Sequence, residues 1–321
     1  MARNMRGKKK HSTRKERIVL KTAQDVARNP SEDEEFSYHL SRFLETVAIN
    51  ENVIPFRRKI MFSFERAMTT IIKAMWGNRR VYVFGSQIEG TTTMKLMSDT
   101  DYLHRVDMFR LFLDSEIPPL QPHNQQVFLK MSTSGCASQF CVLTILDPST
   151  LAMRFQKLDP TRDPVDIVNF FLKDWTTING MIPHTIMFHN KNITNQHPVI
   201  LQQAKIHGPA ESIRNIDNVY ACYCKSLPKQ CKFVFKRPRP GHWPSEKTLK
   251  KAKKYGVFIV PQGPPKSTNI CTYDYFEYQW RISTNLTERL FMFSLDTVHL
   301  KAFVLTKMIK RSYLPQNIKT G

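Results

Sequence analysis

Two short runs decide the fold of this chain: Val81-Tyr82-Val83-Phe84-Gly85-Ser86 and Ser98-Asp99-Thr100-Asp101-Tyr102-Leu103. Each contains β-branched or aromatic residues of the kind found in buried strands, and the apolar part of the first run is closed by a glycine. They predict a strand, a tight turn and a second strand. Because residues i and i+2 of a strand share a face, we expect Asp99 and Asp101 to project together.

The aspartate pair and the Gly-Ser turn together indicate phosphate and metal chemistry. Adjacent carboxylates repel unless protons or cations neutralise them, and magnesium favours oxygen ligands while keeping substrate phosphates in its shell. Gly85 allows backbone to approach a ligand closely, and the Ser86 hydroxyl with nearby amides can hold a terminal phosphate. The alternative is an ordinary turn and a solvated strand end. In combination, the motifs resemble the signature of the nucleotidyltransferase superfamily, which implies three carboxylates and two metals.

Asp217 is the candidate for the third carboxylate. It comes just before the apolar run 219–222, so a strand could supply it beside Asp99 and Asp101. A carboxylate there would help the first metal to activate the acceptor hydroxyl, while the second metal steadies the triphosphate. An aspartate before a strand is also a common turn residue, and spacing alone leaves that alternative open.

The positive charge of the chain is concentrated in two places. Lys plus Arg number 48 and Asp plus Glu number 27, which gives a formal net charge of +21. Residues 1–17 contribute eight basic side chains against one acidic, and residues 225–254 contribute eleven against one, so these stretches supply +7 and +10 and leave +4 elsewhere. Such local basicity indicates contact with a polyanion at two places.

The segment 247–254 is the main candidate for a nucleic-acid surface. It is long enough for more than two turns of helix, and clustered ammonium groups bind phosphate backbones without reading bases. A solvated helix face explains the same pattern. The residues predicted to contact nucleic acid are Arg237, Arg239, Lys247, Lys250, Lys251, Lys253 and Lys254.

Other patterns predict the scaffold. Between residues 59 and 76, apolar residues recur at helical spacing and predict a core helix whose stripe is explained by packing: Ile60, Phe64, Met68, Ile71, Ile72 and Met75. Ser31 is the expected N-cap of an earlier helix with an acidic first turn. Strands are predicted at 108–113, 126–131 and 140–146, and a helix at 164–175. The histidines between 184 and 207 lack metal-ligand spacing.

A helix is also predicted from Leu300 to Arg311. Its apolar stripe consists of Leu300, Phe303, Val304 and Met308, and Lys307 falls on the same face. The Lys307 ammonium is expected either to reach an anion or to extend into solvent.

Later motifs make the resemblance more specific. The run from Phe235 to Ser245, with Lys-Arg-Pro-Arg-Pro-Gly-His-Trp-Pro inside it, and Trp280-Arg281-Ile282-Ser283 with Glu288 resemble the male-abnormal-twenty-one (Mab) family. That family includes cyclic GMP-AMP synthase and the cGAS-like receptors, and the motifs follow its order from about residue 60 onward. The resemblance implies phosphate contacts by Gly85 and Ser86, metal binding by Asp99, Asp101 and Asp217, a nucleotide-facing Arg281 and a phosphate-contacting Lys307.

Three departures from the family pattern shape the expectations. Where the vertebrate enzyme has a Cys/His zinc insertion between two helices, this chain has Phe293-Ser294-Leu295-Asp296 without a Cys/His cluster, so we expect no zinc. Ser283-Thr284-Asn285 stands where the family often has Ser-Phe-Ser. We expect Asn285 to be the N-cap of the helix that begins there, with Glu288 as its capping partner. The chain ends at Gly321, before further helices and a base-stacking Ser-Tyr pair of the family, which implies a fragment or a product that has lost activity.

We therefore expect an α/β, bilobal nucleotidyltransferase fold with a mixed sheet, flanking helices and a partial helical C-terminal lobe. The expected divisions are a disordered basic tail at 1–16, the nucleotidyltransferase core at 17–245 and the partial helical lobe at 246–321. The six scattered cysteines predict reduced thiols in an intracellular protein, cytoplasmic with nuclear import through the basic tail as a second possibility. The longest apolar runs fall short of the ~20 residues that span a bilayer, so no membrane partner is expected.

The resemblance implies a nucleic-acid-activated enzyme that makes a cyclic dinucleotide from ATP and/or GTP with Mg²⁺ or Mn²⁺, and double-stranded RNA or DNA as its activator. Two alternatives remain: a non-catalytic family member that binds nucleic acid or a protein, and a template-independent RNA nucleotidyltransferase.

Overall fold

The computed structural model describes residues 30–76, 79–92, 99–107, 109–119, 127–146, 180–184, 205–213, 215–265 and 273–313. The chain divides into two compact units, 1–48 and 49–321. In the first unit, helix α2 (Pro30–Thr46) has Glu32 and Asp33 in its first turn, at the positive end of the helix dipole. Because the helix already includes Pro30, whose fixed φ suits a first turn, Ser31 lies inside it and is not the predicted N-cap.

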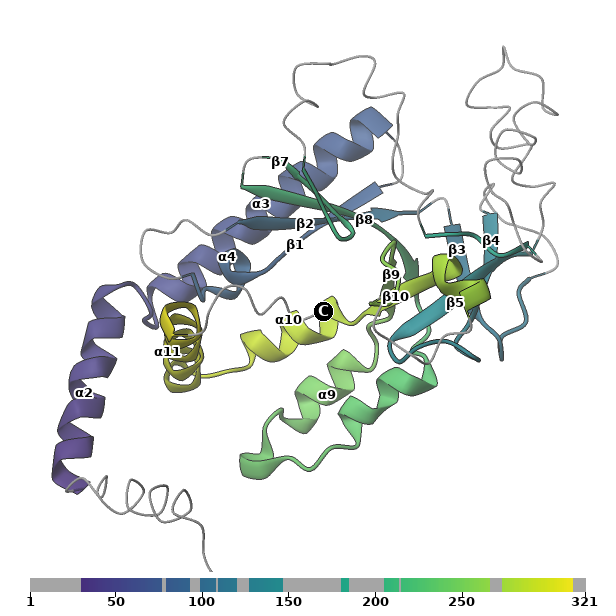
Figure 1. The fold of residues 1–321 in the computed structure, drawn as a ribbon. Helices are drawn as coiled ribbons and strands as arrows, with labels where there is room; N and C mark the ends of the chain where they lie inside the picture. Colours follow the sequence, from purple (N-terminus) through teal and green to yellow (C-terminus); the bar gives the residue numbers. More distant parts are fainter. Residues whose placement is uncertain are drawn as a thin grey trace, which may run out of the picture. The chain divides into compact units, whose positions relative to one another are not determined.

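A mixed sheet organises the second unit (Figure 1). Its strands are β1 (Arg79–Phe84), β2 (Thr100–Val106), β3 (Phe109–Leu113), β4 (Val127–Ser132), β5 (Phe140–Ile145), β6 (Lys205–His207), β7 (Ala210–Ile213), β8 (Ile216–Cys224), β9 (Val257–Val260) and β10 (Gln279–Ser283). Within the described residues the order is β1-β2-β8-β9-β10-β5-β4-β3, and β7 pairs with both β8 and β6. β2 runs parallel to β8, and β3 to β4, while the other pairs are antiparallel. The predicted mixed sheet with flanking helices is therefore confirmed.

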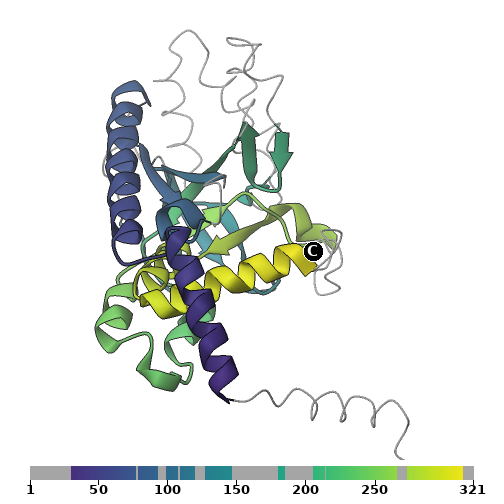
Figure 2. The same ribbon diagram turned by 90° about the vertical axis from the view of Figure 1, so that its left-hand side faces the viewer.

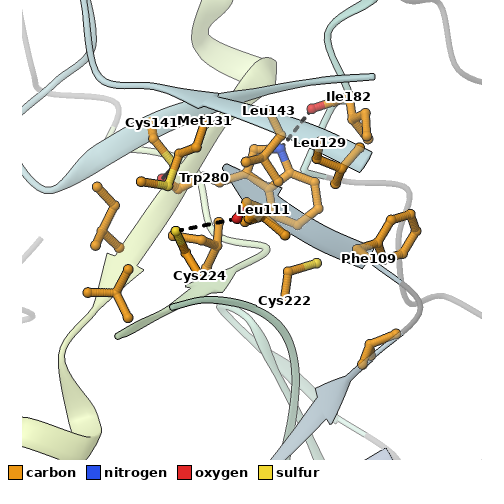
Figure 3. Packing of buried hydrophobic residues seen from close by; sticks show 14 of the residues in the cluster. Phe109, Leu111, Leu129, Met131, Cys141, Leu143, Ile182, Cys222, Cys224 and Trp280 are labelled. Carbon is orange, nitrogen blue, oxygen red and sulfur yellow. Dashed lines mark hydrogen bonds between the residues drawn. The ribbon is translucent and has the colours of Figure 1, made fainter. Parts of the chain in front are cut away.

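The strands predicted after Asp101 are confirmed as β3, β4 and β5, because their alternate apolar residues are buried in one core. Figure 3 shows Trp280 of β10 among Leu111, Leu129 and Leu143 of these strands. The indole Nε1 of Trp280 donates to the carbonyl oxygen of Ile182 at 2.7 Å, so its one polar atom is satisfied inside the core. The helix predicted at 164–175 lies outside the described residues.

The segment 246–321, for which we expected a partial helical lobe, contributes two strands to the sheet as well as helices. Trp280 and Arg281 lie in the second of these strands, β10. Trp280 and Ile282 are buried and Arg281 between them is exposed, which is the alternation of a strand. β10 pairs with β5 on one side and β9 on the other.

The helices of the second unit are α3 (Val53–Trp76), α4 (Ser86–Glu89), α9 (Glu246–Ala252), α10 (Asn285–Phe293) and α11 (Thr297–Tyr313), with 3-10 turns η3 (Lys229–Phe235), η4 (Pro240–His242) and η5 (Tyr273–Tyr278). The N-cap of α10 is Thr284, so the predicted cap at Asn285 is wrong by one residue. The Thr284 hydroxyl donates to Glu288 Oε1 at 2.6 Å, so Glu288 still contacts the capping residue.

Side chains protect the open edge of β1. The Thr69 hydroxyl accepts from the Val81 amide and donates to its carbonyl, both within 3.2 Å. Glu65 accepts from the Val83 amide at 2.8 Å, and Arg289 donates to the Val83 carbonyl at 2.8 Å and pairs with Glu65 at 2.7 Å. An edge strand whose backbone groups are occupied in this way is not free to pair with another chain.

The predicted helix at 59–76 is confirmed within α3, but the prediction that its apolar stripe is core is only partly correct. Ile72 is 4% exposed, whereas Ile60 and Ile71 are 49% and 50% exposed. Phe64 and Met75 are also exposed. The helix therefore has an apolar face that the described fold leaves uncovered.

The described cysteines are free thiols that serve as packing residues: Cys136, Cys141, Cys222, Cys224 and Cys231. Burial raises the pKa of Cys224 and of Cys231 to about 11, and raises the pKa of Cys222 further. These thiols are therefore protonated at neutral pH and are poor metal ligands. Cys271 lies outside the described residues. No described helix combines the length and the apolar composition required to cross a membrane.

Candidate active site

The parallel pairing of β2 and β8 brings two of the predicted carboxylates together. Asp101, the second residue of β2, is the register partner of Asp217, the second residue of β8. Neighbouring strands lie about 4.8 Å apart and register partners face the same side, so these two side chains are adjacent. Asp217 is thus part of a strand beside Asp101, and not a turn residue.

Gly85 lies against the same carboxyl group. Phe84, the last residue of β1, is the register partner of Asp101. A Cβ atom on Gly85 would lie 2.0 Å from Asp101 Oδ2, and its φ of +79° belongs to the left-handed region that favours glycine. The glycine is therefore required twice, by the backbone conformation and by the close approach of the carboxylate.

The carboxylates influence one another electrostatically. Burial, and then the charges of Asp217, Asp99 and Glu89, raise the pKa of Asp101 to about 6, against a lowering effect of Lys307. Asp99 lies just before β2 and is exposed, so the expected strand position of Asp99 is wrong by one residue. It still acts on Asp101. The structure thus groups the three predicted carboxylates around a half-buried site of high negative charge.

The donor set fits a divalent cation chemically. Oxygen-rich, negatively charged sites are those that Mg²⁺ and Mn²⁺ prefer, and a cation would offset the repulsion that raises the pKa of Asp101. As the side chains stand, no three acidic, His or Cys groups of the described residues converge closely enough to share one ion. Asp217 Oδ1 accepts from the Ser212 hydroxyl at 2.5 Å, so β7 holds this carboxylate in place.

Glu89 is a site residue that the sequence analysis did not single out. It ends α4, is partly buried, and its pKa is raised by burial although the charge of Lys307 lowers it. Its carboxylate Oε2 lies 3.4 Å from the Thr91 hydroxyl, which is also 3.4 Å from Lys307 Nζ. The signal was present in the sequence, because Glu89 completes the Gly-Ser-x-x-Glu-Gly motif that begins at Gly85.

Lys307 approaches this site from α11, and its contacts with Thr91 and Phe303 do not decide between the two predicted alternatives. Leu300 and Val304, on α11, are buried at 2% and 1% exposure, so one side of this helix packs against the fold. Lys307 Nζ lies over the Phe303 ring, 4.8 Å from its centroid, and reaches Thr91. The ammonium is therefore close enough to the carboxylates to affect the pKa of both Glu89 and Asp101.

Arg58 joins the helices around the site. Its guanidinium donates to the Glu89 carbonyl at 2.9 and 3.2 Å and to the carbonyls of Met292 and Phe293 at 3.4 and 3.5 Å. It also stacks over the Phe293 ring at 4.5 Å. Because one side chain from α3 holds the ends of α4 and α10, it fixes the turn that carries Ser86 and Glu89.

Ser86 begins α4 directly after Gly85 and is partly buried. Its carbonyl accepts from the Gly90 and Thr91 amides and from the Thr92 hydroxyl, so the turn is held tightly. Arg281 lies elsewhere in the sheet: it is exposed and donates to Gln262 Oε1 at 3.0 Å. The structure therefore brings Gly85 and Ser86 to the carboxylates, while the described contact of Arg281 is with the turn that follows β9.

The predicted nucleic-acid residues gather around α9. Lys247, Lys250, Lys251 and Lys254 line a surface hollow of about 390 Å³. The helix ends at Ala252, so Lys253 and Lys254 follow it and the expected helix is shorter than predicted. Ser245 caps the start of α9 by accepting from the Thr248 amide.

The two predicted arginines are held by contacts within the chain. Arg237 stacks over the Phe233 ring at 4.6 Å. Arg239 donates to the Pro244 carbonyl at 3.0 Å and lies 3.7 Å from Glu246. Arg237 is exposed and keeps its charge available, whereas Arg239 is partly buried and acts chiefly on the loop before α9.

Comparison with known proteins assigns no relatives to this chain: no family model matches it, and a search of curated proteins found no match.

Proposed function

We propose that the chain is a metal-dependent nucleotidyltransferase that joins ATP and/or GTP into a cyclic dinucleotide. The observation that carries the proposal is the register pairing of Asp101 with Asp217, with the Gly85 backbone against the Asp101 carboxylate. This arrangement unites residues from three separate segments at one side of the sheet. The motif resemblance to the Mab family supports the same assignment.

Each residue has a role that follows from its chemistry. Asp99, Asp101 and Asp217 would hold Mg²⁺ or Mn²⁺, and the metal would supply charge neutralisation at the triphosphate and activation of the acceptor hydroxyl. The Gly85-Ser86 turn offers backbone amides and a hydroxyl to a phosphate. Lys307 would bind a phosphate oxygen, since its ammonium already lies beside Thr91 at the edge of the carboxylates.

Binding of duplex RNA or DNA is assigned to the lysine hollow at α9. Four exposed ammonium groups facing one hollow bind the phosphate backbone through charge. The same feature favours a second candidate function, a binding module without catalysis, because the hollow does not depend on the carboxylates. A template-independent RNA nucleotidyltransferase is a third candidate that uses the same site on an RNA end.

One experiment separates these functions. Purified protein is incubated with labelled ATP and GTP, Mg²⁺ or Mn²⁺, and either duplex RNA, duplex DNA or no duplex, and the products are resolved. A cyclic dinucleotide formed only with duplex supports the proposal. Extension of the RNA end instead identifies the third function, and duplex binding without any nucleotide product identifies the binding module.

A further inference from the structure

Helix α3 exposes an ordered apolar face along its outer side. The helix packs along β1 and turns its other side away from the sheet (Figure 2). The large apolar side chains on that outer side are between 49% and 62% exposed: Phe56, Ile60, Ile71 and Met75. Phe64 lies at the border of this face, because it is 42% exposed and its ring stacks on Tyr102 of β2 at 6.0 Å. Exposed apolar residues are ordinary when scattered, but a continuous row along one helix marks an interaction surface.

Two rows on this side of α3 repeat every seven residues, although the large apolar side chains themselves do not. Lys59, Arg66 and Lys73 form a basic row at this spacing, and the exposed Ala67 and Ala74 continue the position of Ile60. A strict seven-residue repeat places each residue type in a nearly straight row on a helix, which is the pattern of a surface that packs against a second helix. Small residues between two raised rows allow the backbone of that second helix to come close.

The charge on this face is of one sign. The single acidic residue of α3 is Glu65, which is 14% exposed and paired with Arg289 at 2.7 Å, so it does not offset the basic row. The Ser63 and Thr70 hydroxyls donate to carbonyls one turn earlier, at 3.0 and 3.1 Å. Their donor hydrogens are thus used within the helix, and the face offers a partner apolar area beside positive charge.

We propose that the outer face of α3 binds an acidic amphipathic helix of a partner protein. The apolar row would receive the partner's apolar stripe, and the basic row would face carboxylates repeated every seven residues. From residue 56 to residue 75 the face extends for about 30 Å, which is about five turns of a partner helix. This inference is independent of the proposed catalysis.

Two other occupants fit the face less well. Duplex nucleic acid is held through phosphates and has no use for a row of large apolar side chains. In a homodimer whose two α3 helices lay antiparallel, the basic row of one copy would face the basic row of the other. These like charges would repel. An acidic helix satisfies both the apolar row and the basic row.

The probe is a synthetic three-heptad peptide with leucine at the a and d positions and glutamate at e and g, and its matched control has lysine at e and g. We expect the full chain to bind the glutamate peptide at least tenfold more tightly in fluorescence anisotropy. Hydrogen exchange should slow in residues 56–75 when that peptide binds. Equal affinity for the two peptides would overturn the proposal.

Two variants test which residues carry the binding. Ile60→Ser with Ile71→Ser should weaken binding of the glutamate peptide at least tenfold, whereas Val298→Ser with Ile309→Ser, at exposed positions of α11, should leave it unchanged. Lys59→Glu with Arg66→Glu and Lys73→Glu should reverse the preference so that the lysine peptide binds, and this gain of binding shows that the variant is folded. Retained preference for the glutamate peptide in the charge variant would contradict the proposal. The proposal would also be contradicted if these variants lost duplex binding or self-association and kept their binding of the glutamate peptide.

Discussion

The carboxylate group on β2 and β8 and the lysine group at α9 both collect like charges, but by opposite means. Asp101 and Asp217 come from strands 116 positions apart in sequence and meet through strand register in a half-buried place. The four lysines of the hollow lie within residues 247–254 of one short helix and its following turn, and all are exposed.

The difference shows which charge cluster depends on a ligand. Water screens exposed ammonium groups, so the lysine cluster costs the fold little and can remain without a partner. Partly buried carboxylates lose hydration and repel one another more strongly, and the pKa of Asp101 rises first through burial and then through the neighbouring charges. Four predictions test this contrast, from the largest expected effect to the smallest.

The largest effect should come from the carboxylates. Asp101→Asn or Asp217→Asn should reduce nucleotide transfer by about 10³-fold or more, equivalent to roughly 4 kcal/mol of barrier, because each removes charge that holds the metal. The double variant should be no worse than either single one, since residues that act as a unit are not additive. Turnover of labelled ATP and GTP measures this.

The control for this experiment is Asp114→Asn, because Asp114 is an exposed carboxylate 3.6 Å from Lys130 on another part of the sheet. Its turnover should match wild type. A double variant far less active than Asp101→Asn alone would separate Asp217 from the metal site.

The second effect concerns the lysines. Lys250→Glu with Lys251→Glu and Lys254→Glu should weaken duplex binding by at least tenfold. It should also flatten the salt dependence, by up to about 0.9 in log-log slope for each phosphate of B-DNA that the protein no longer neutralises. ATP binding should be retained. Salt titrations compare this variant with Lys59→Glu, Arg66→Glu and Lys73→Glu, which changes the net charge equally. If both triple variants flatten the slope alike, net charge and not the hollow governs binding.

The third effect concerns the contact between Gly85 and Asp101. Gly85→Ala should destabilise the protein by roughly 2–3 kcal/mol, since the new Cβ meets Asp101 and the backbone is strained. Gly135→Ala is the matched control, because Gly135 has a φ of +70° with nothing within 4 Å of a new Cβ. Chemical denaturation of both variants isolates the contact as their difference, and equal losses would show that strain alone acts.

The smallest effect is the pH dependence of metal-free stability. The folded pKa of Asp101, about 6, exceeds the unfolded value of about 3.9, so the folded state binds the extra proton between these pH values. The resulting destabilisation is absent below about pH 4 and complete above about pH 6. After allowance for partial exposure, Asp101→Asn should gain roughly 1 kcal/mol at pH 7.5, or about 2–4 °C in Tm.

Thermal melts in EDTA at pH 4 and pH 7.5 check the sign. The gain should vanish at pH 4, and saturating Mn²⁺ should stabilise wild type more than the variant. A variant that is less stable than wild type at pH 7.5 would mean that the Asp101 carboxylate is held by the fold and not strained by it.

Local patterns predicted most of the elements correctly. The run Val81 to Phe84 is β1, the runs after Asp101 are β3 to β5, and the helix predicted at 300–311 lies within α11. These predictions succeed because burial alternates with a period of two in strands and 3.6 in helices.

The candidate site was predicted in its residues but not in its arrangement. Asp99, Asp101 and Asp217 were named from motifs, whereas Thr91, Ser212 and Arg58 appear only when α4, β7 and α3 are placed around them. Such contacts join residues far apart in the chain, and no local period records them.

The sequence by itself determined the position of each charge, the glycine at residue 85 and the apolar period of each element, because these are properties of neighbouring residues. Only the tertiary structure decided that β8 runs parallel to β2 with Asp217 beside Asp101, and that four of the six residues of the predicted apolar stripe of α3 are exposed. The physical reason is the same in both cases. An apolar or charged residue favours burial or contact in general, but which surface covers it depends on strand pairing and packing between distant segments.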